Sequence, residues 1–587
     1  MVRRDLDGFL IPRADEHQGE YVPPQAQRLA WITGFTGSAG IALVQADRGL
    51  VWVDGRYTLQ VRDETDGTIF ESLHLVETPP HVWMAKNLRR RERIGYDPWL
   101  HTSAALRRLR RAAKRAGAEL VSCDSNPLDA VWTDQPERPR GEIVSHPLAY
   151  AGQSSTSKRE ALGRGLMLEE LHAAVITDPA SIAWLLNVRG SDVDHTPLPL
   201  SFAVLHADAR VDWFVDEEKV TNACRSGLGD RVVVRGSHEL PEALAVLGAE
   251  GRRVLHDPKS GASWLRDRLE AAGADVVDGD DPCSLPKACK NDVELAGARE
   301  AHIRDGAALT EFLAWLHAQA GGGELTELSA AEHLAELRSQ RALFKDLSFP
   351  TISGFAGNGA IIHYRVTPQT DATIEAGPGA IYLVDSGGQY LDGTTDVTRT
   401  VALGPPTDEQ RDRFTRVLQG HIDLAMARFP VGTNGGQLDT LARSALWAAG
   451  LDYDHGTGHG VGSFLGVHEG PQRVHKSGSS EVLREGMILS NEPGYYKAGE
   501  YGIRIENLVA IHRAEPPPGA ERPVLEFETL TLCPIDLSLT DPSMLTSAQR
   551  GWLDRYHGRV REALTSLVSD SARAWLDLAT RPLAAVG

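Results

Sequence analysis

Four acidic residues in apolar, strand-like runs of the C-terminal half constrain this chain more than any other feature. The run IYLV (381–384) ends on Asp385, and Asp396 follows on the return segment after glycine-rich turns. The run GMILSN (486–491) ends on Glu492, and YGIRI (501–505) continues through Glu506 into a further apolar stretch. Acidic residues are rare inside strands and costly to bury without a partner. The pattern therefore predicts two β-hairpins that bring four carboxylates toward a shared partner, with Glu506 inside a strand.

Each pair of acids taken alone is also compatible with hydrogen-bonded or salt-bridged core residues. Four carboxylates together repel one another unless cations neutralise them. Two divalent ions would balance their charge, and an oxygen-rich site with a single imidazole suits manganese, with zinc and cobalt as alternatives. Two ions about 3.5–4 Å apart share a hydroxide and polarise a carbonyl in metal-dependent aminopeptidases. This hypothesis requires one metal-binding histidine between the two pairs of carboxylates.

Residues 453–470 supply histidines at the required place in the chain. The stretch contains His455, His459, His468 and six glycines. It lacks the G-x-G-x-x-G spacing of a dinucleotide loop, and the chain has no G-x-x-x-x-G-K-S/T phosphate loop. The sequence HEGP (468–471) begins like an H-E-x-x-H zinc motif, but its glycine and proline would break the helix that this motif needs. The wall of an active site is the best interpretation of the stretch.

Length and internal repetition predict several domains. A chain of 587 residues is too long for one hydrophobic core. Residues 29–54 and 182–216 are alike: Trp31 aligns with Trp184, and two short apolar strands joined by an Ala-Asp turn follow in each. We interpret them as a duplicated α/β domain, although two unrelated hairpins would also give this weak match. Asn291 and Glu294 have the spacing of a capping box that opens a long helix.

Composition and charge argue against several classes of protein. The formal net charge of -19 argues against a nucleic-acid-binding protein. The arginine-rich runs at 89–93 and 107–114 fit solvated helix faces better than a nucleic-acid surface. No apolar stretch is long enough for a transmembrane helix, and the N-terminus lacks the apolar core of a secretory signal. Five scattered cysteines indicate reduced thiols, so we expect a cytoplasmic protein with no membrane partner.

The acids and the Gly-His-Gly histidine occur in the order of the pita-bread metallopeptidases, a family that includes methionine aminopeptidase, prolidase and aminopeptidase P. Motifs along nearly the whole chain are similar to those of the large, three-domain, cytosolic type of aminopeptidase P: GFTGSAG (34–40), DGRY (54–57), NGAIIHY (358–364), LVDSG (383–387), DGTTDVTRT (392–400), HGTGHGVG (455–462), VHEGP (467–471), NEPGYY (491–496) and TLTLCPI (529–535). The resemblance implies a mixed α/β (α+β) fold. It places two creatinase-like N-terminal α/β domains at 1–150 and 151–290, and a pita-bread catalytic domain at 291–587 with a C-terminal extension from about residue 520.

The resemblance also implies a role for each residue that matches the family motifs. Asp385 would bind one metal ion, and Asp396 and Glu506 would bridge two. His459 and Glu492 would complete the shell of the second ion, with Glu492 also handling the proton of the bridging water. The substrate-side histidines would contact the scissile carbonyl or pass a proton to the leaving nitrogen; they are His363, His455 and His468. Arg504 shares a strand face with Glu506 and would orient a carboxylate ligand, or else form an ordinary interior ion pair.

The implied activity is that of a metal-dependent Xaa-Pro aminopeptidase. It hydrolyses the first bond of peptides with proline at position two, through a hydroxide that bridges two divalent ions, by expectation Mn²⁺ with Zn²⁺ or Co²⁺ as alternatives. The resemblance implies a homodimer. A prolidase specific for dipeptides is the alternative within the enzyme class, but prolidases usually have one N-terminal domain. Creatinase shares the fold and lacks the ligands, and non-catalytic pita-bread binding modules typically lose them, whereas all five are present here.

Overall fold

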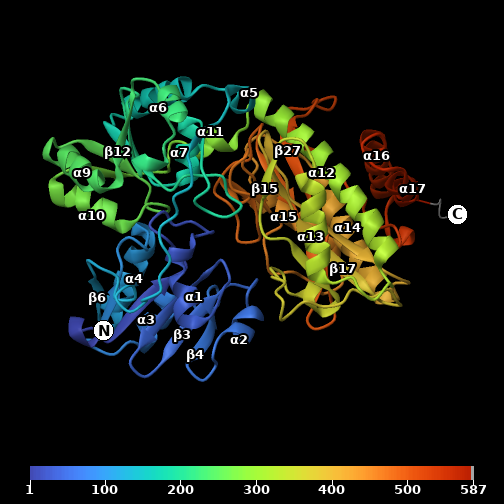
Figure 1. Cartoon of the computed structure of the whole chain (residues 1–587), viewed down its shortest axis with the longest axis horizontal. Coiled ribbons are helices and arrows are strands. Elements are labelled where there is room, and N and C mark those ends of the chain that lie inside the picture. The colour runs from blue at the N-terminus through green and yellow to red at the C-terminus, as the bar shows by residue number, and fades with distance from the viewer. Residues whose placement is uncertain (584–587) are drawn as a thin grey trace. The chain divides into compact units, whose positions relative to one another are not determined.

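The computed structural model describes residues 1–583, which form two units. The first unit comprises Met1–Leu148 and Gln153–Ser284, and it runs from blue to green in Figure 1. The second comprises Ala149–Gly152 and the chain from Leu285 onward, and it runs from green to red. Each unit has its own sheets and its own buried apolar clusters, so each is described separately.

The first unit contains two six-stranded sheets that have the same strand order and the same directions. The first sheet has the order β4-β3-β2-β1-β5-β6 and the second has β12-β11-β10-β8-β13-β14. The central strand of each, β1 or β8, pairs antiparallel with one neighbour and parallel with the other. The strands are β1 (Gly8–Pro12), β2 (Gly40–Gln45), β3 (Gly49–Val53), β4 (Phe70–His74), β5 (Arg93–Tyr96) and β6 (Glu119–Ser122), then β8 (Ala173–Ile176), β10 (Phe202–His206), β11 (Val211–Val215), β12 (Val232–Gly236), β13 (Arg253–His256) and β14 (Asp275–Asp278). This shared topology confirms the predicted duplicated α/β domain.

Helices accompany both sheets and bury their apolar sides against the strands. They are α1 (Arg28–Thr33), α2 (Gln60–Glu64), α3 (Pro80–Asn87), α4 (Ser103–Ala116), α6 (Ser155–Leu168), α7 (Pro179–Leu186), α8 (Asn222–Gly227), α9 (Leu240–Ala249) and α10 (Ser263–Ala272). A short pair, β7 (Val144–Ser145) with β9 (Val188–Arg189), completes the unit. The arginines of residues 107–114 lie on α4, whose other face buries Leu106 and Leu109, as predicted.

The prediction that residues 89–93 form a helix face is wrong. The amide of Asn87 donates to the carbonyl of Trp83 where α3 ends, and Arg91 adopts a left-handed φ of 72°. Residues 89–92 therefore form an exposed turn, and Arg93 begins β5. Three arginines in succession favour a solvated surface without fixing which backbone conformation displays it.

The second unit is built on three main sheets and one two-stranded ribbon. β15 (Phe344–Leu347), β18 (Gly388–Tyr390) and β19 (Gly393–Thr394) form one sheet, and β16 (Ile352–Phe355), β17 (Ile381–Ser386) and β20 (Val397–Ala402) form another. The largest has the order β21-β28-β27-β24-β22-β23. Its strands are β21 (Arg428–Pro430), β22 (Gly458–Gly460), β23 (Glu469–Val474), β24 (Ile488–Asn491), β27 (Asn507–Arg513) and β28 (Val524–Thr529), and the ribbon pairs β25 (Gly494–Lys497) with β26 (Tyr501–Arg504).

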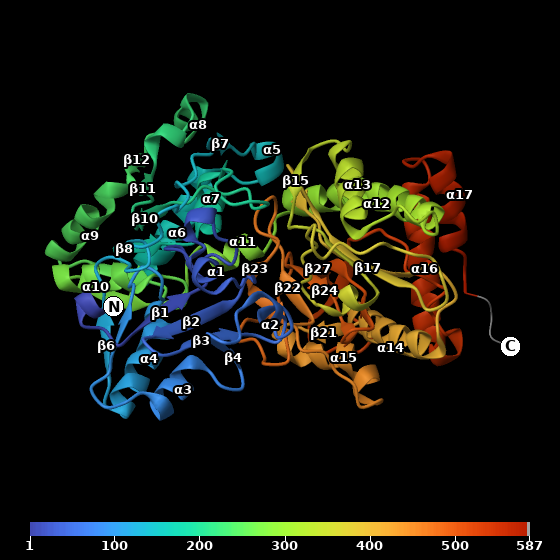
Figure 2. The same ribbon diagram turned by 60° about the horizontal axis from the view of Figure 1, so that its bottom comes forward.

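Long helices cover these sheets and hold the strands in place. The helices are α5 (Leu148–Ala151) and α11 (Ser284–Ala288) at the start of the unit, then α12 (Asp292–Gln319), α13 (Glu327–Ser339), α14 (Asp408–Ala425), α15 (Gly435–Trp447), α16 (Ser547–Leu564) and α17 (Asp570–Ala579). The predicted capping box of Asn291 and Glu294 opens α12. Phe312 and Leu316 of α12 pack on Val384 of β17 and Val401 of β20. The last two helices, red in Figure 2, pack against α12 and α14.

Two further findings bear on the sequence predictions. Of the helices in residues 1–583, none combines the length and the apolar character that crossing a bilayer requires. All five cysteines within that range are free thiols, and four of them are buried.

Candidate metal centre

The first pair of acids lies at one end of the sheet formed by β16, β17 and β20. β17 and β20 pair antiparallel with Asp385 opposite Thr398, so Asp396 stands just before β20 and close to Asp385 along the same edge. The two strands form the predicted antiparallel pair, and the connection between them carries strands of its own. It leaves the sheet and forms β18, which pairs with β15 on one side and with β19 on the other. Gly387 is required in this connection because a Cβ there would lie 1.9 Å from the carbonyl oxygen of Thr395.

The second pair of acids comes from the ends of strands in the ribbon and the largest sheet. Glu492 directly follows β24, as predicted. Glu506 does not lie inside a strand, which corrects the prediction: the apolar run breaks at Ile505 and Glu506, between β26 and β27. The buried guanidinium of Arg399 donates to the carbonyl of Glu506 at 2.6 Å and to the side chain of Asn507 at 2.8 Å, so the break is held from β20.

His459 enters between the two pairs from β22. Its backbone N–H donates to the Ser490 hydroxyl at 2.9 Å, and its Nδ1 lies 3.0 Å from the carbonyl of Gly460. A carbonyl only accepts, so Nδ1 carries a proton and Nε2 is the ring nitrogen that faces the carboxylates, where it can bind a cation once it is deprotonated. Gly458 is required because a Cβ there would lie 2.0 Å from the carbonyl oxygen of Ser490 on β24. Glycine at this position thus allows β22 and β24 to approach closely.

The ligand-type atoms of Asp396, His459 and Glu506 lie within 4.8 Å of one another. Nε2 of His459 is 3.4 Å from Oδ2 of Asp396 and 3.6 Å from Oε1 of Glu492. Oδ1 of Asp385 and Oδ1 of Asp396 are buried and have no hydrogen-bond partner within the described residues. Buried carboxylate oxygens are rarely left unsatisfied. The arrangement therefore leaves oxygen atoms directed at a position that a cation can fill.

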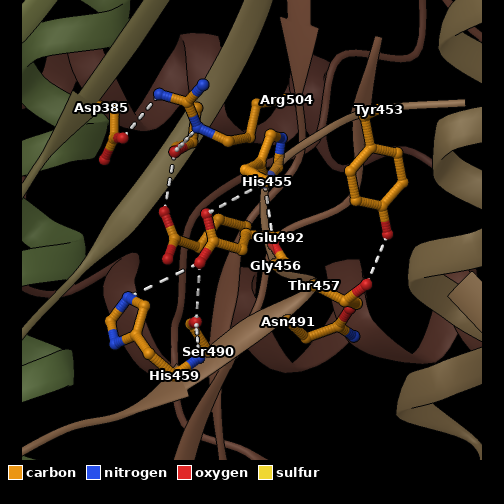
Figure 3. Close-up of polar contacts among 12 residues, drawn as sticks. Asp385, Tyr453, His455, Gly456, Thr457, His459, Ser490, Asn491, Glu492 and Arg504 are labelled. Atoms are coloured by element: carbon orange, nitrogen blue, oxygen red, sulfur yellow. Dashed lines mark hydrogen bonds and ion pairs between the residues drawn. The ribbon is translucent and has the colours of Figure 1, made fainter. Parts of the chain in front are cut away.

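One arginine links the acids to the surrounding residues (Figure 3). The buried Arg504 donates from Nη2 to Oδ2 of Asp385 at 2.6 Å and from Nε to the Thr398 hydroxyl at 3.1 Å. Thr398 in turn donates to Oε2 of Glu506 at 2.7 Å. Arg504 also donates from Nη1 to the hydroxyl of Tyr496 at 2.7 Å. It contacts Asp385 directly and reaches Glu506 through a threonine, although Glu506 is nearer in sequence.

The negative charge of the four carboxylates is larger than the positive charge that the nearby arginine supplies. Four carboxylates face a single arginine, so three negative charges remain when all four are ionised and His459 is neutral. Burial raises the pKa of Asp385 to about 6, with Asp396 adding to the rise and Arg504 opposing it. Burial and the neighbouring carboxylates also raise the pKa of Glu506 well above its usual range. The pKa of His459 rises to about 9 because Asp396 and Glu492 outweigh its burial.

Two of the three other histidines, His455 and His468, lie at the margin of the cluster. His455 is buried, with Nδ1 2.8 Å from the carbonyl of Gly456 and Nε2 accepting from the Tyr496 hydroxyl at 2.9 Å. His468 is half-buried, and its ring lies edge-on to that of His459 with 4.3 Å between centroids. His363 is half-buried in the loop between β16 and β17. The structure thus places His455 and His468 beside the acids, on the chain segment where the sequence had clustered them.

Sequence reasoning missed Glu327, which holds the loop of His363. This fully buried carboxylate accepts from the backbone N–H of Phe355 at 2.6 Å and from the hydroxyl of Tyr364 at 2.9 Å. It also accepts from the amide of Asn358 at 3.1 Å and from the N–H of Ala372 at 3.1 Å. Glu327 opens α13 behind the N-cap Thr326, and an acid in the first turn of a helix is an ordinary surface signal. Only the tertiary structure shows that it is buried.

The donor set fits divalent cations. Carboxylate oxygens dominate, one imidazole nitrogen joins them, and two oxygens are buried without partners among residues 1–583. A metal-ligating histidine usually donates its other ring N–H to a carbonyl or carboxylate, as His459 does to Gly460.

Comparisons with known proteins match nearly the whole chain and include the segments that form this site. Metallopeptidase family M24 matches residues 296–513, and the C-terminal region of peptidase M24 matches 523–583. The creatinase/prolidase N-terminal domain matches twice, at 1–131 and 134–294. A probable Xaa-Pro aminopeptidase P of Paracoccidioides brasiliensis is 38% identical over 99% of this chain and 97% of its own length. Aminopeptidase P2 of Arabidopsis thaliana is 39% identical over 99% of this chain and 86% of its own length.

Solved structures show the same relationship. The X-prolyl aminopeptidase of Caenorhabditis elegans, described as a cytosolic enzyme with a di-nuclear active site, is 34% identical with a TM-score of 0.94, covering 98% of this chain and 95% of that one. An Xaa-Pro dipeptidase of Bacillus anthracis is 22% identical with a TM-score of 0.53, and it covers 65% of this chain and 99% of its own. The second likeness shows a common fold only.

Proposed function

The chain belongs to metallopeptidase family M24, in its group of Xaa-Pro aminopeptidases P, and we propose from this premise that it releases the first amino acid from peptides whose second residue is proline. The observation that carries the proposal is the buried, under-neutralised cluster of acids into which His459 directs Nε2. Relatives that align over almost the full chain bear the name of this activity. The enzyme is a hydrolase of the dinuclear metallopeptidase type.

For the individual residues we propose the following roles. Asp385 would hold one divalent ion, His459 and Glu492 would hold a second, and Asp396 and Glu506 would contribute to both. Two ions held there would activate a water and polarise the scissile carbonyl. Arg504 keeps Asp385 ionised and, through Thr398, fixes the rotamer of Glu506.

Glu492 is the acid best placed to move a proton. Its side chain is 18% exposed, whereas the side chain of Asp396 is 5% exposed, so it faces the open side of the cluster. Burial raises the pKa of Glu492 above its usual range, with Asp396 adding to the rise while His459 and Arg504 oppose it. A carboxyl of this kind takes a proton from water and gives it to the proline nitrogen as that nitrogen leaves.

The histidines act on the substrate side. Tyr496 accepts from Arg504 and therefore donates its own proton to Nε2 of His455, which fixes the tautomer of that ring. His363 and His468 contact the scissile carbonyl and the negative charge that develops on its oxygen. The proline nitrogen of the substrate carries no N–H, so the pocket needs no acceptor for it.

We further propose Mn²⁺ as the physiological metal, with Zn²⁺ or Co²⁺ as alternatives, since oxygen-rich ligation favours harder ions. A cytoplasmic location is supported by the free thiols and by the cytosolic description of the Caenorhabditis elegans enzyme. The family likeness supports a homodimer. We also propose domain boundaries near residues 150 and 290, with a C-terminal extension from about residue 520.

A test uses the purified full chain, chelated and then restored with Mn²⁺, Zn²⁺ or Co²⁺. An Arg-Pro-Pro peptide should lose its first residue only after metal is restored, and an Arg-Ala-Pro peptide should stay intact. Metal analysis should give two ions per chain. Cleavage of Xaa-Pro dipeptides alone would establish a prolidase instead. Absence of both metal-dependent cleavage and two-ion stoichiometry would refute the enzyme proposal.

A further inference from the structure

Three buried charged residues, Lys287, Lys290 and Glu469, form a cluster directly behind His468. Nζ of Lys287 donates to Oε2 of Glu469 at 2.8 Å, and Nζ of Lys290 donates to Oε1. The side chains of the two lysines and of the glutamate are 4%, 1% and 2% exposed. Two lysines thus share one buried carboxylate inside the second unit.

This cluster is poorly explained as a device for stability. Desolvation makes buried ion pairs costly, and apolar residues of similar volume often stabilise a core as well or better. Nζ of Lys290 needs two backbone carbonyls, those of Lys287 at 3.1 Å and Ala288 at 3.4 Å, to complete its hydrogen bonds. Burial would raise the pKa of Glu469, but the two lysines outweigh it and lower that pKa, so the carboxylate is ionised.

Glu469 controls the segment that carries His468. It is the first residue of β23 and lies opposite Gly460 of β22 in the register, so His459 and His468 are brought together by this pairing. Residues 461–468, which connect β22 to β23, form a loop outside the strands. The loop is fixed near its middle, where Gln389 donates to the carbonyl of Leu465 at 2.7 Å. The Glu469 carboxylate fixes its far end.

The lysines are a rigid support because their own segment is bound to the largest sheet. The N–H of Lys290 donates to the carbonyl of Gly486 at 2.9 Å, and Cys289 forms a β-bridge with Met487 just before β24. A Cβ at Gly486 would lie 2.6 Å from the carbonyl of Lys290, so the two segments are in close contact. The lysine segment is therefore bound to the residues that lead into β24, the strand that ends at Glu492.

We propose that Lys287 and Lys290, acting through Glu469, are positioning residues that hold His468 at the metal centre. The two lysines lie outside the residues matched by the M24 family, 296–513, and within those matched by the second creatinase/prolidase N-terminal domain, 134–294. The functional catalytic unit thus begins at the segment of α11, before the long helix α12. This inference rests on the proposed function, because the role of His468 is defined by it.

The decisive experiment is a double-mutant cycle between Glu469→Gln and His468→Ala, read as kcat on an Arg-Pro-Pro peptide. If Glu469 acts through His468, Glu469→Gln lowers kcat by about 10- to 100-fold in the parent, since a misplacement near 1 Å has effects of this size. In the His468→Ala background the same change alters kcat by less than about twofold. A purely structural role would lower kcat by the same factor in both backgrounds, which would overturn the proposal.

Single substitutions keep the test independent of folding. Lys287→Met and Lys290→Met each leave Glu469 one lysine and a neutral pair, so both variants should fold and bind two metal ions per chain. Each should lower kcat in the parent and have little effect in His468→Ala. The matched control is Lys219→Met, which removes a buried lysine from its ion pair with Asp192 in the first unit. It should lower the melting temperature and leave kcat within about twofold of the parent.

The outcomes separate this inference from the function on which it rests. A parent chain that fails to cleave the peptide with any metal refutes the proposed function. A parent that cleaves, with Glu469→Gln and both lysine variants cleaving equally well, refutes only the positioning role. Loss of metal in the lysine variants, or a fall in kcat for Lys219→Met that follows its loss of stability, would also overturn it.

Discussion

Asp305 and Asp396 are both buried acids of the second unit, 2% and 4% exposed as whole residues, but only Asp305 has an arginine of its own. Arg338 donates to both oxygens of Asp305 at 2.8 and 3.1 Å, and the Tyr390 hydroxyl donates to it at 2.9 Å. Arg338 outweighs burial, so the pKa of Asp305 falls. Asp396 leaves Oδ1 without a partner, and its neighbour Glu506 has a raised pKa.

The difference distinguishes structural acids from functional ones. An acid with its own arginine contributes to the fold whether or not metal is present, and removing it exposes a buried cation. An acid without one is destabilising until an external cation binds, and removing it affects activity far more than folding. The two kinds cannot be told apart by burial alone, because both are nearly inaccessible to solvent.

The largest expected effect is on kcat and comes from replacing Asp396, the acid without its own arginine. Asp396→Asn should lower kcat on an Arg-Pro-Pro peptide by about 10³-fold or more, since a bridging ligand is lost. His459→Ala should have the same effect. Both proteins should keep the parent circular dichroism spectrum, because neither change leaves a buried arginine without its acid. Near-normal turnover in either variant would refute the ligand assignment.

The opposite result is expected for the partnered acid. Asp305→Asn leaves the Arg338 guanidinium buried without a counter-charge and should cost about 3–5 kcal/mol in the free energy of unfolding. Metal content and kcat per folded molecule should remain those of the parent. Denaturant unfolding and metal analysis check this, with Asp305→Asn/Arg338→Met as the control that recovers stability. A loss of metal in Asp305→Asn would remove the distinction between the two kinds of acid.

Arg504 is intermediate between the two cases, because a single arginine serves a cluster of four acids. Arg504→Lys retains the charge but loses the fork that reaches Asp385, Thr398 and Tyr496 together. Supporting contacts of this kind are typically worth about 10- to 100-fold in metal affinity or activity. We expect that loss in apparent metal affinity, measured by titrating metal into chelated protein. Equal affinity in the variant would show that charge alone is sufficient.

The smallest expected effect is on the melting temperature, where the direction of the pH dependence is predicted. Asp385, Glu492 and Glu506 have raised pKa values, so their favourable contribution in the metal-free protein is lost as pH rises, for Asp385 through about 6. His459 follows as pH rises through about 9. Bound metal replaces these protons. The rise in melting temperature on adding Mn²⁺ should be larger at pH 8 than at pH 5.5, by roughly 2–4 °C or more.

The matched protein for this measurement is Asp396→Asn, in which the rise should be small and nearly independent of pH. A metal-induced rise that is larger at pH 5.5 than at pH 8 would contradict the charge balance proposed for the site.

The sequence allowed the placement of these acids to be anticipated because the signal was local. An aspartate that ends a β-branched run is conspicuous, and hairpin pairing brings Asp385 and Asp396 together with few assumptions. The break at Glu506 could not be seen, because it depends on Arg399 reaching across from β20. The duplicated sheets of the first unit were predictable from a weak repeat, since strand order follows from the same succession of elements.

Residues that act through burial were missed for a common physical reason. Glu327 and Lys290 have the appearance of surface residues at the start of helices, and nothing nearby in the sequence indicates their partners. Those partners, Tyr364 and Glu469, lie 37 and 179 residues away along the chain. A single sequence reports local preference well and contains little information on which charged residues become enclosed by the fold.

The position of Glu506 has a consequence for the order of synthesis. The acids of the centre are spread from Asp385 to Glu506, and Arg399, which holds the break at Glu506, also binds carbonyls of Cys533 and Pro534. Domains emerge from the ribosome N-terminus first and fold as units. A nascent chain therefore cannot close the metal centre until residues beyond 530 have been made. Peptide cleavage would then be withheld until translation has passed Pro534.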